Sequence, residues 1–195
     1  KSTHLIQMKK KKIQPTVLIN LLLKMGTSLQ YDKIQDIDEL IRGFKINNYS
    51  KSSIIFNEED LSRMNSKFIS SLDFKTLNKQ LGKNLEKNVW EVIKFNISKI
   101  EDIDNWIKIL DRSFSASSKL KNKKLFDFAV DCLPKEVTKN TWKEWCEEIS
   151  INTNLKGKSL FLPLRQKLTG IDKGPEMNLI LPLLGRDEII RRLKL

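Results

Sequence analysis

The sequence predicts an all-α protein, and three features of it carry that prediction. Apolar residues recur at the three- and four-residue spacing of an amphipathic helix along most of the chain. Side chains that cap helix N-termini, such as Asp36 and Asp73, stand just before several of these segments. No stretch shows the sustained alternation of apolar and polar residues that is typical of a half-buried strand.

Three helices are expected in the first part of the chain. Residues 16–26 predict a buried helix with Pro15 in its first turn, where the missing N–H is not needed. Asp36 and Glu39 have the spacing of a capping box and precede a second helix. Asn57 is followed by three acids, which suit the positive end of the dipole of a third helix.

Similar signals divide the middle of the chain. Asp73 and Asn84 are expected to cap two helices. Capping-box spacing at residues 98–101 and at residues 141–144 predicts the starts of two more. Between them, residues 125–132 form an apolar-rich segment that ends before a proline, as a helix does.

Two short helices are predicted to fold back around one tight corner near the C-terminus. Pro163 is expected to open the first, which Gly170 ends, and residues 174–176 are expected to open the second. Arg165 lies early in the first of these helices. Its apolar face is already taken by other side chains, so Arg165 is either a solvated arginine or a contact residue. The predicted apolar face consists of Leu160, Phe161, Leu164 and Leu168.

Length and charge bound the function. The chain has 195 residues and 22.8 kDa, enough for one large or two small domains. It has no apolar run near the ~18 residues that a membrane span needs, so a soluble protein is expected. A formal net charge of +12 favours a polyanionic partner, with nucleic acid ahead of a membrane surface. The alternative is that the abundance of lysine, asparagine and isoleucine reflects an AT-rich genome.

The cysteines and the histidine exclude a usual structural zinc site. Cys132, Cys146 and His4 are the only residues of these two types, whereas such a site usually has four Cys or His ligands. We expect the two thiols to be buried, as in a cytosolic protein, and we expect no metal.

The C-terminal corner resembles a known family. The run GKSLFLPLRQKLTG, followed by GPE and LLGR, resembles the anticodon-binding region of bacterial glutamyl-tRNA synthetase, a class I aminoacyl-tRNA synthetase. In that family the corner belongs to the last helical subdomain, which grips the anticodon loop. An earlier block, with LLLKMGTS and residues 50–52, 56–57 and 61–65, resembles the family's helical domain that contacts the inner corner and stem of the tRNA. The resemblance covers residue 13 to the end.

The resemblance implies how the chain divides into domains, and it also implies that the family's catalytic domain is missing from these residues. A basic segment at 1–12 precedes a stem-contact domain at 13–71, and two anticodon-binding subdomains follow at 72–133 and 134–195. The family's Rossmann-type catalytic domain, which uses ATP and magnesium, has no counterpart in these residues, which hold no phosphate-binding loop or acid–base constellation. We therefore expect a tRNA-recognition fragment of a glutamate–tRNA ligase that is inactive alone and binds no cofactor. The alternative is a stand-alone helical module that binds RNA or a protein.

The resemblance also implies where the chain touches tRNA. By position, Asn96 replaces an arginine with which discriminating members accept cytosine as the third anticodon nucleotide and reject the glutamine anticodon. Its amide lacks the charge and the fixed fork of arginine, so charging of glutamine tRNA as well as glutamate tRNA is left open. Glu147 replaces a basic contact residue found in one branch, and we give it no such role, because an acid repels phosphate. The expected anticodon contacts are Lys94, Asn96, Arg165, Gly174, Pro175 and Met177.

Lysines and tryptophans are further candidates, each with a structural alternative. Phosphate contacts position RNA without reading its sequence, and we expect them at Lys51, Lys156, Lys158 and Lys173, although lysines most often lie on a solvated face. Trp90 and Trp106 are expected in the core. Trp142 and Trp145 cannot both face inward from one helix, so one of them is available to stack on a base. The chain is expected to act as a cytoplasmic monomer away from membranes.

Overall fold

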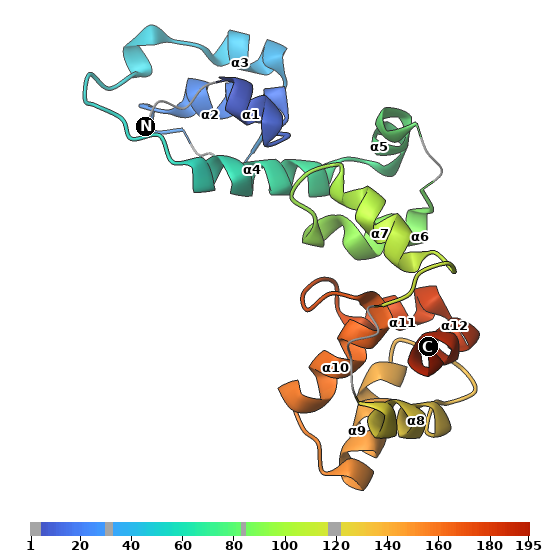
Figure 1. Ribbon diagram of the computed structural model, residues 1–195. Coiled ribbons are helices and arrows are strands. Elements are labelled where there is room, and N and C mark those ends of the chain that lie inside the picture. Colours follow the sequence, from blue (N-terminus) through green and yellow to red (C-terminus); the bar gives the residue numbers. More distant parts are fainter. Residues whose placement is uncertain (1–4, 30–32, 83–84, 117–121) are drawn as a thin grey trace. The chain divides into compact units, whose positions relative to one another are not determined.

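The computed structural model describes residues 5–29, 33–82, 85–116 and 122–195, which form helices, turns and loops and no strand (Figure 1). The all-α prediction is confirmed. The chain divides into two compact units. Unit 1 comprises residues 1–84 and 97–103, and unit 2 comprises residues 85–96 and 104–195. The expectations that concern His4 and Asn84 lie outside the described residues, and the finer division into segments at 13–71, 72–133 and 134–195 stays a prediction.

Unit 1 is built around the packing of α2 on α4. Its hydrophobic core contains Met8, Val17 and Leu21 on one side and Leu61 and Met64 on the other. α3 packs against α2 as well. The elements of this unit are α1 (Leu5–Lys10), α2 (Pro15–Lys24), α3 (Ile37–Gly43), the 3-10 turn η1 (Ile46–Asn48), α4 (Glu58–Ser71) and α5 (Phe74–Leu81).

Three predicted helix starts in unit 1 are confirmed by their hydrogen bonds. The side chain of Asp36 accepts from the backbone N–H of Glu39 at 2.7 Å, and that of Asp73 accepts from Thr76 at 2.9 Å. Asn57 caps α4 in the same way. Each cap satisfies an N–H that has no partner within its helix.

Unit 2 is built around the packing of α8 to α12 on one another. α12 packs against α8, α10 and α11, and α9 packs against α8, α10 and α11. α6 packs against α11. The elements are α6 (Lys87–Ile93), the 3-10 turn η2 (Lys94–Asn96), α7 (Asp102–Leu110, in this unit from residue 104), α8 (Lys123–Asp131), α9 (Thr141–Thr153), α10 (Lys158–Thr169), α11 (Met177–Leu184) and α12 (Arg186–Lys194).

Two predicted capping boxes are wrong. α7 begins at Asp102, whose carboxylate accepts from the backbone N–H groups of Ser98 and Lys99 at 2.9 and 3.1 Å. This carboxylate bonds back to N–H groups that precede α7, and the helix begins four residues after Ser98. Thr141 lies inside the first turn of α9, and its hydroxyl accepts from the N–H of Thr138 at 2.8 Å in the preceding turn.

The start of the corner helix also differs from the prediction. α10 begins at Lys158, so Pro163 lies inside this helix and does not open it. The start is set by Gly157, which has φ 54°, and whose carbonyl accepts from the N–H groups of Leu160 and Phe161. Phe161 lies beside the buried stripe of α10 and is 44% exposed. Its assignment to the apolar face was wrong, whereas Leu160, Leu164 and Leu168 are fully buried.

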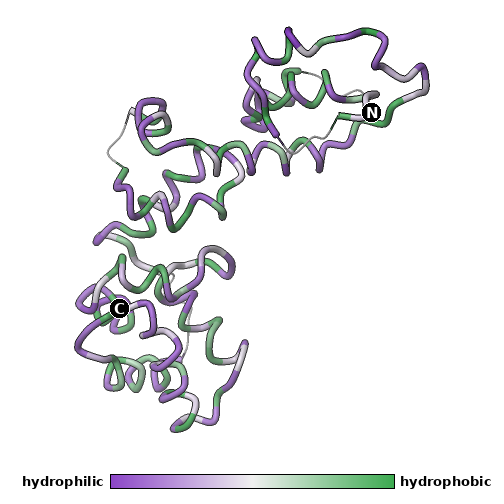
Figure 2. Tube along the Cα trace, turned by 180° about the vertical axis from the view of Figure 1, so that it is seen from behind, coloured by the Kyte–Doolittle hydropathy of each residue, from purple (hydrophilic) through white to green (hydrophobic). Residues whose placement is uncertain are grey.

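Hydrophobic and hydrophilic segments alternate along most of the chain, as Figure 2 shows. This is the pattern of helices that each bury one face. No helix among the described residues is long and apolar enough to cross a membrane.

Candidate nucleic-acid interface

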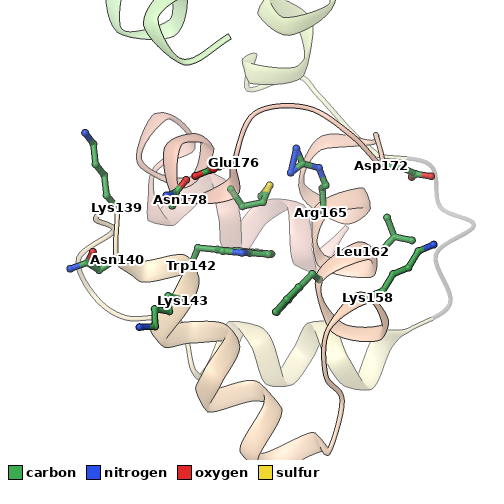
Figure 3. Close-up of a pocket in the computed structure, with 12 residues that line it drawn as sticks. Lys139, Asn140, Trp142, Lys143, Lys158, Leu162, Arg165, Asp172, Glu176 and Asn178 are labelled. Carbon is green, nitrogen blue, oxygen red and sulfur yellow. The ribbon is translucent and has the colours of Figure 1, made fainter. Parts of the chain in front are cut away.

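A groove of about 720 Å³ opens between α9, α10 and the start of α11 in unit 2 (Figure 3). α10 and α11 each pack against α9, which places the groove walls on a common support. Apolar, aromatic, cationic and amide side chains share its walls. They are Lys139, Asn140, Trp142, Lys143, Lys158, Phe161, Leu162, Arg165, Asp172, Glu176, Met177 and Asn178.

Two aromatic side chains form a ridge at the groove surface. The rings of Trp142 and Phe161 lie 6.0 Å apart between centroids and are tilted by 53°. Behind them, Trp145 meets Trp142 edge-on at 6.1 Å and is buried, and its indole N–H donates to the carbonyl of Ala129 at 2.8 Å. The expectation that only one of the two tryptophans faces inward holds. Trp142 is held in place by a buried neighbour and keeps part of its surface exposed.

A second groove of about 570 Å³ adjoins the first, and Trp142, Lys143 and Phe161 line both. The aromatic ridge therefore has a hollow on each of two sides. Lys156 and Glu147 line this second groove, so it carries both signs of charge.

The predicted corner is closed by Arg165. Its Nη2 donates to the carbonyl of Pro175 at 2.5 Å, which ties α10 to the segment that leads into α11. Gly174 passes close by, because a Cβ there would stand 3.3 Å from that same nitrogen. Burial lowers the pKa of the Arg165 guanidinium from its ordinary value, although arginine stays protonated in proteins.

Two polar atoms of this groove are buried without a hydrogen-bond partner. They are Nε of Arg165, a donor, and Oδ1 of Asn178, an acceptor. Among the described residues no other buried side-chain nitrogen or oxygen lacks a partner. A buried polar group without a partner costs about 1–3 kcal/mol, so both atoms lower the stability of this part of the chain.

Lysines give the rim of the groove a cationic side. Lys139, Lys143 and Lys158 line it, and all three are exposed. Two acids also line the groove, Asp172, which accepts from the amide of Gln166 at 2.7 Å, and Glu176, and Figure 3 shows them on opposite sides of it. A cationic rim over an aromatic floor matches the chemistry of single-stranded nucleic acid, in which phosphates alternate with flat bases.

Comparisons with known proteins identify this part of the chain. Residues 107–195 match the anticodon binding domain family. Over 174 residues, or 87% of the chain, the sequence is 37% identical to glutamate–tRNA ligase 1 of Rickettsia massiliae and 38% identical to glutamate–tRNA ligase 2 of Rickettsia canadensis. Most of the chain is thus similar in sequence to one part of these glutamate–tRNA ligases. It spans 39% of the length of these curated relatives.

The glutamate–tRNA ligase fold is also seen in solved structures. The crystal structure of a glutamate tRNA ligase from Elizabethkingia meningosepticum superposes with a TM-score of 0.70 at 20% identity. The match covers 96% of this chain and 41% of that one. A glutamate-tRNA synthetase from Elizabethkingia anophelis gives a TM-score of 0.68. At this identity the likeness shows the fold.

The structure brings together four of the six anticodon contacts expected from the resemblance to this ligase family. Arg165 and Met177 line the first groove, and Gly174 and Pro175 form the corner beside Arg165. Pro175 and Met177 are buried, so their main contribution in the free chain is to shape the wall. The contact roles themselves stay predictions.

The other two expected anticodon contacts lie in η2, outside the groove. Lys94 forms an ion pair with Glu91 at 2.5 Å, and its Nζ lies 5.2 Å from the ring centroid of Phe95. Asn96 is exposed, and Lys94 is the other predicted contact residue in the same turn.

The four expected phosphate contacts are all exposed lysines. Lys158 lines the first groove and Lys156 the second. Lys173 stands in the corner segment before Gly174, and Lys51 lies in a loop of unit 1.

Several groove residues were missed by reasoning from the sequence. Phe161 was assigned to the core, although Leu160, Leu164 and Leu168 already complete a helical stripe without it. Lys139, Lys143 and Asn178 carried no local signal, because a lysine or an asparagine on a helix is usually solvated. Only the packing of α9, α10 and α11 brings them to one surface.

The thiols take no part in this chemistry. Cys146 is buried beneath the second groove, and burial raises the pKa of its thiol to about 12. Burial likewise raises the pKa of Cys132, which is partly exposed. Neither thiol forms the thiolate that nucleophilic chemistry requires near neutral pH.

Proposed function

We propose that this chain recognises the anticodon arm of glutamate tRNA for a glutamate–tRNA ligase. The observation that carries the proposal is the Trp142–Phe161 ridge beside the Arg165 corner, within the segment that matches the anticodon binding domain family. Unpaired loop bases are commonly recognised by stacking on aromatic rings and by hydrogen bonds to their edges. The groove offers both kinds of contact.

In this proposal each part of the groove has a separate task. Bases splayed out of the anticodon loop stack on Trp142 and Phe161, and each stacked base contributes about 1–3 kcal/mol to binding. Lys143, Lys158 and their neighbours neutralise phosphates and hold the loop in register. Arg165 keeps the corner closed through its hydrogen bond to the carbonyl of Pro175.

The catalytic activity that we infer belongs to the complete ligase. We propose that the ligase attaches glutamate to its tRNA with ATP and magnesium, in the cytoplasm, and that this chain alone is inactive and acts as a monomer. The relatives are about two and a half times as long as the matched segment, which leaves room for a catalytic domain. Asn96 in η2 supports a further proposal, that glutamine tRNA is charged as well, since an amide lacks the fixed charged fork of arginine.

A second candidate function is a stand-alone helical module that binds a protein. It draws support from apolar side chains that unit 1 leaves exposed, among them Ile41, Ile46 and Ile55. Exposed apolar patches mark protein contact sites more often than nucleic-acid sites. The groove of unit 2 favours RNA, and the two functions are separated by the experiment below.

Direct binding tests the proposal. The chain is titrated with glutamate tRNA, glutamine tRNA and an unrelated tRNA at 50 and 200 mM salt, with the Arg165→Ala variant alongside. We expect a preference of about 1–3 kcal/mol for glutamate tRNA over the unrelated tRNA, because each good base contact contributes that much. The preference should survive the higher salt, which weakens only the phosphate contacts, and Arg165→Ala should remove it.

Binding of all three tRNAs with equal affinity, or of none, would overturn the proposed function. The thermal unfolding midpoint of the Arg165→Ala variant serves as a check that the corner still folds. Glutamine tRNA bound as tightly as glutamate tRNA supports the relaxed specificity inferred from Asn96, and discrimination between them contradicts it.

A further inference from the structure

We propose that Phe95 is a stacking platform for an unpaired base of the anticodon loop, outside both grooves. This inference rests on the proposed function and deepens it, since it adds a contact residue for which neither the sequence motifs nor the comparisons indicate a role. It is carried by an aromatic ring that lies open to solvent on a turn anchored within unit 2.

Phe95 is 75% exposed, although phenylalanine is among the residues that folded proteins most often bury. Among the described residues of unit 2, the other large apolar side chains that are strongly exposed have evident places. Ile151 and Phe161 line the grooves, and Leu195 is the last residue of the chain. Phe95 lines neither groove, so its exposure requires another explanation.

The backbone of Phe95 is held by the helix before it. η2 continues α6 directly, and the backbone N–H of Lys94 donates to the carbonyl of Trp90. Trp90 and Ile93 are buried, and α6 packs against α11. The ring therefore projects from an anchored turn, and little backbone freedom is lost when a ligand covers it.

A cation lies beside the ring. Nζ of Lys94 is 5.2 Å from the ring centroid, within the range of a cation–π contact. The same nitrogen forms an ion pair with Glu91 at 2.5 Å, which keeps it in this place. Because Phe95 remains 75% exposed, the ammonium leaves most of the ring open. Glu91 balances the charge of Lys94, so what the turn chiefly offers a ligand is the ring.

An unpaired base fits this surface better than a protein does. Protein contact sites are contiguous apolar patches, whereas both neighbours of Phe95 in the turn, Lys94 and Asn96, are polar. A base lays its flat face on an aromatic ring and keeps its polar edge free for solvent or polar groups. The helix α11, against which α6 packs, also contributes Met177 to the first groove, so the ring and the groove belong to one packed unit.

The test uses the full chain and RNA stem-loops with the glutamate anticodon, in which one loop base at a time is replaced by an abasic residue. Phe95→Ala removes the ring, and Phe95→Tyr keeps it. Leu195→Ala is the matched control, because Leu195 is 60% exposed in the same unit and lines neither groove. Since these side chains are exposed, all three variants should keep the unfolding midpoint of the unmodified chain. A lowered midpoint of Phe95→Ala would show that the ring packs within the chain, and it would overturn the inference.

We expect Phe95→Ala to bind the intact stem-loop about tenfold more weakly than the unmodified chain does, because one base loses its stacking partner. Phe95→Tyr and Leu195→Ala should stay within about twofold of the unmodified chain. Removal of one particular loop base should weaken the unmodified chain by about tenfold and Phe95→Ala by about twofold or less, because in that variant the contact is already lost. The dependence of affinity on salt should not change, because no phosphate contact is removed.

Equal binding of the intact stem-loop by Phe95→Ala and by the unmodified chain overturns this inference and leaves the proposed function intact. The same holds for a loss of affinity that is equal for every abasic stem-loop, because a stacked base must be coupled to the ring at its own position. Failure of the unmodified chain to bind any stem-loop overturns the proposed function itself.

Discussion

Gly174 stands at the tightest point of the corner. Its φ is 153°, and a Cβ there would lie 2.8 Å from two carbons of the Trp106 ring and 3.3 Å from Nη2 of Arg165. A buried indole ring cannot move aside, since Trp106 is 5% exposed. The glycine therefore allows the chain to pass between Trp106 and Arg165 on its way to Pro175.

Replacing this glycine should unfold the corner before it affects anything else. We expect Gly174→Ala to lower the free energy of unfolding by about 2–4 kcal/mol, from the steric overlap and the unfavourable φ together. Gly157→Ala is the control in the same unit, because Gly157 has φ 54° and open space around its Cβ position. It should lose only about 1 kcal/mol.

The measurement is urea unfolding followed by tryptophan fluorescence. All four tryptophans belong to unit 2, so the signal reports on the unit that contains the corner. Equal losses from Gly174→Ala and Gly157→Ala would show that the contact with Trp106 does not constrain this position.

At the residue scale, the sequence shows which residues belong to the corner, but not what surrounds each side chain. The corner with Arg165, Gly174 and Pro175 is visible as a motif, and the structure brings these residues together. That Phe161 faces a groove depends on how α10 packs against α9, which the local sequence does not show. That Asn178 lacks a partner depends on every neighbour of its amide, which no local pattern encodes.

At the scale of elements, α12 is held by charge in a nonpolar setting. Arg192 is 1% exposed, and its guanidinium donates to Glu188, to the carbonyl of Leu168 at the end of α10 and to the carbonyl of Asp111 after α7. It also lies over the ring of Phe114, at 4.6 Å. Because these partners are remote in sequence, the role of Arg192 could not be predicted from the pattern of α12 alone.

Glu188 makes the docking of α12 dependent on pH. Hydrogen bonds from Arg191 and Arg192 hold the pKa of its carboxyl below the ordinary value of 4.5. A carboxyl whose pKa is lowered by folding stabilises the folded state above its unfolded pKa, and this contribution is lost as the pH falls through the folded pKa. Unfolding free energy should therefore decrease as the pH is lowered from about 5.

Glu188→Gln isolates this contribution. At pH 7 we expect it to lower the unfolding free energy by about 3 kcal/mol, because the buried Arg192 loses its counter-charge. Below pH 4 the gap between the variant and the unmodified chain should narrow. Asp187→Asn, at an exposed neighbouring position, should follow the unmodified chain throughout. A gap that stays constant between pH 7 and pH 3 would contradict the assigned charge state of Glu188.

Helix existence was easier to predict than helix starts. The caps at Asp36, Asn57 and Asp73 form as expected because each side chain faces a free N–H within its own turn. At α7, by contrast, the helix begins at Asp102, whose carboxylate accepts from the backbone N–H groups of Ser98 and Lys99. Spacing alone does not show which side chain bonds to which turn.

At the scale of the whole molecule, the net charge of +12 and the all-α architecture were apparent from composition and periodicity. The groove was not, since its walls come from residues 139–143, 158–165 and 172–178, on segments that only tertiary packing brings together. The family motif in the sequence indicated only the part of the groove at the Arg165 corner. Trp142, Phe161 and Asn178 line the rest of it.

The central claim is that the groove of unit 2 holds bases of an anticodon loop, and the indole N–H signals in an NMR titration test it most directly. The chain has four tryptophans, so four signals are expected, and Trp→Phe variants assign them. On addition of an RNA stem-loop with the glutamate anticodon, the signal of Trp142 should shift or broaden strongly. That of Trp145, whose N–H is buried against Ala129, should stay nearly still. RNA binding that leaves the Trp142 signal unmoved would contradict the account.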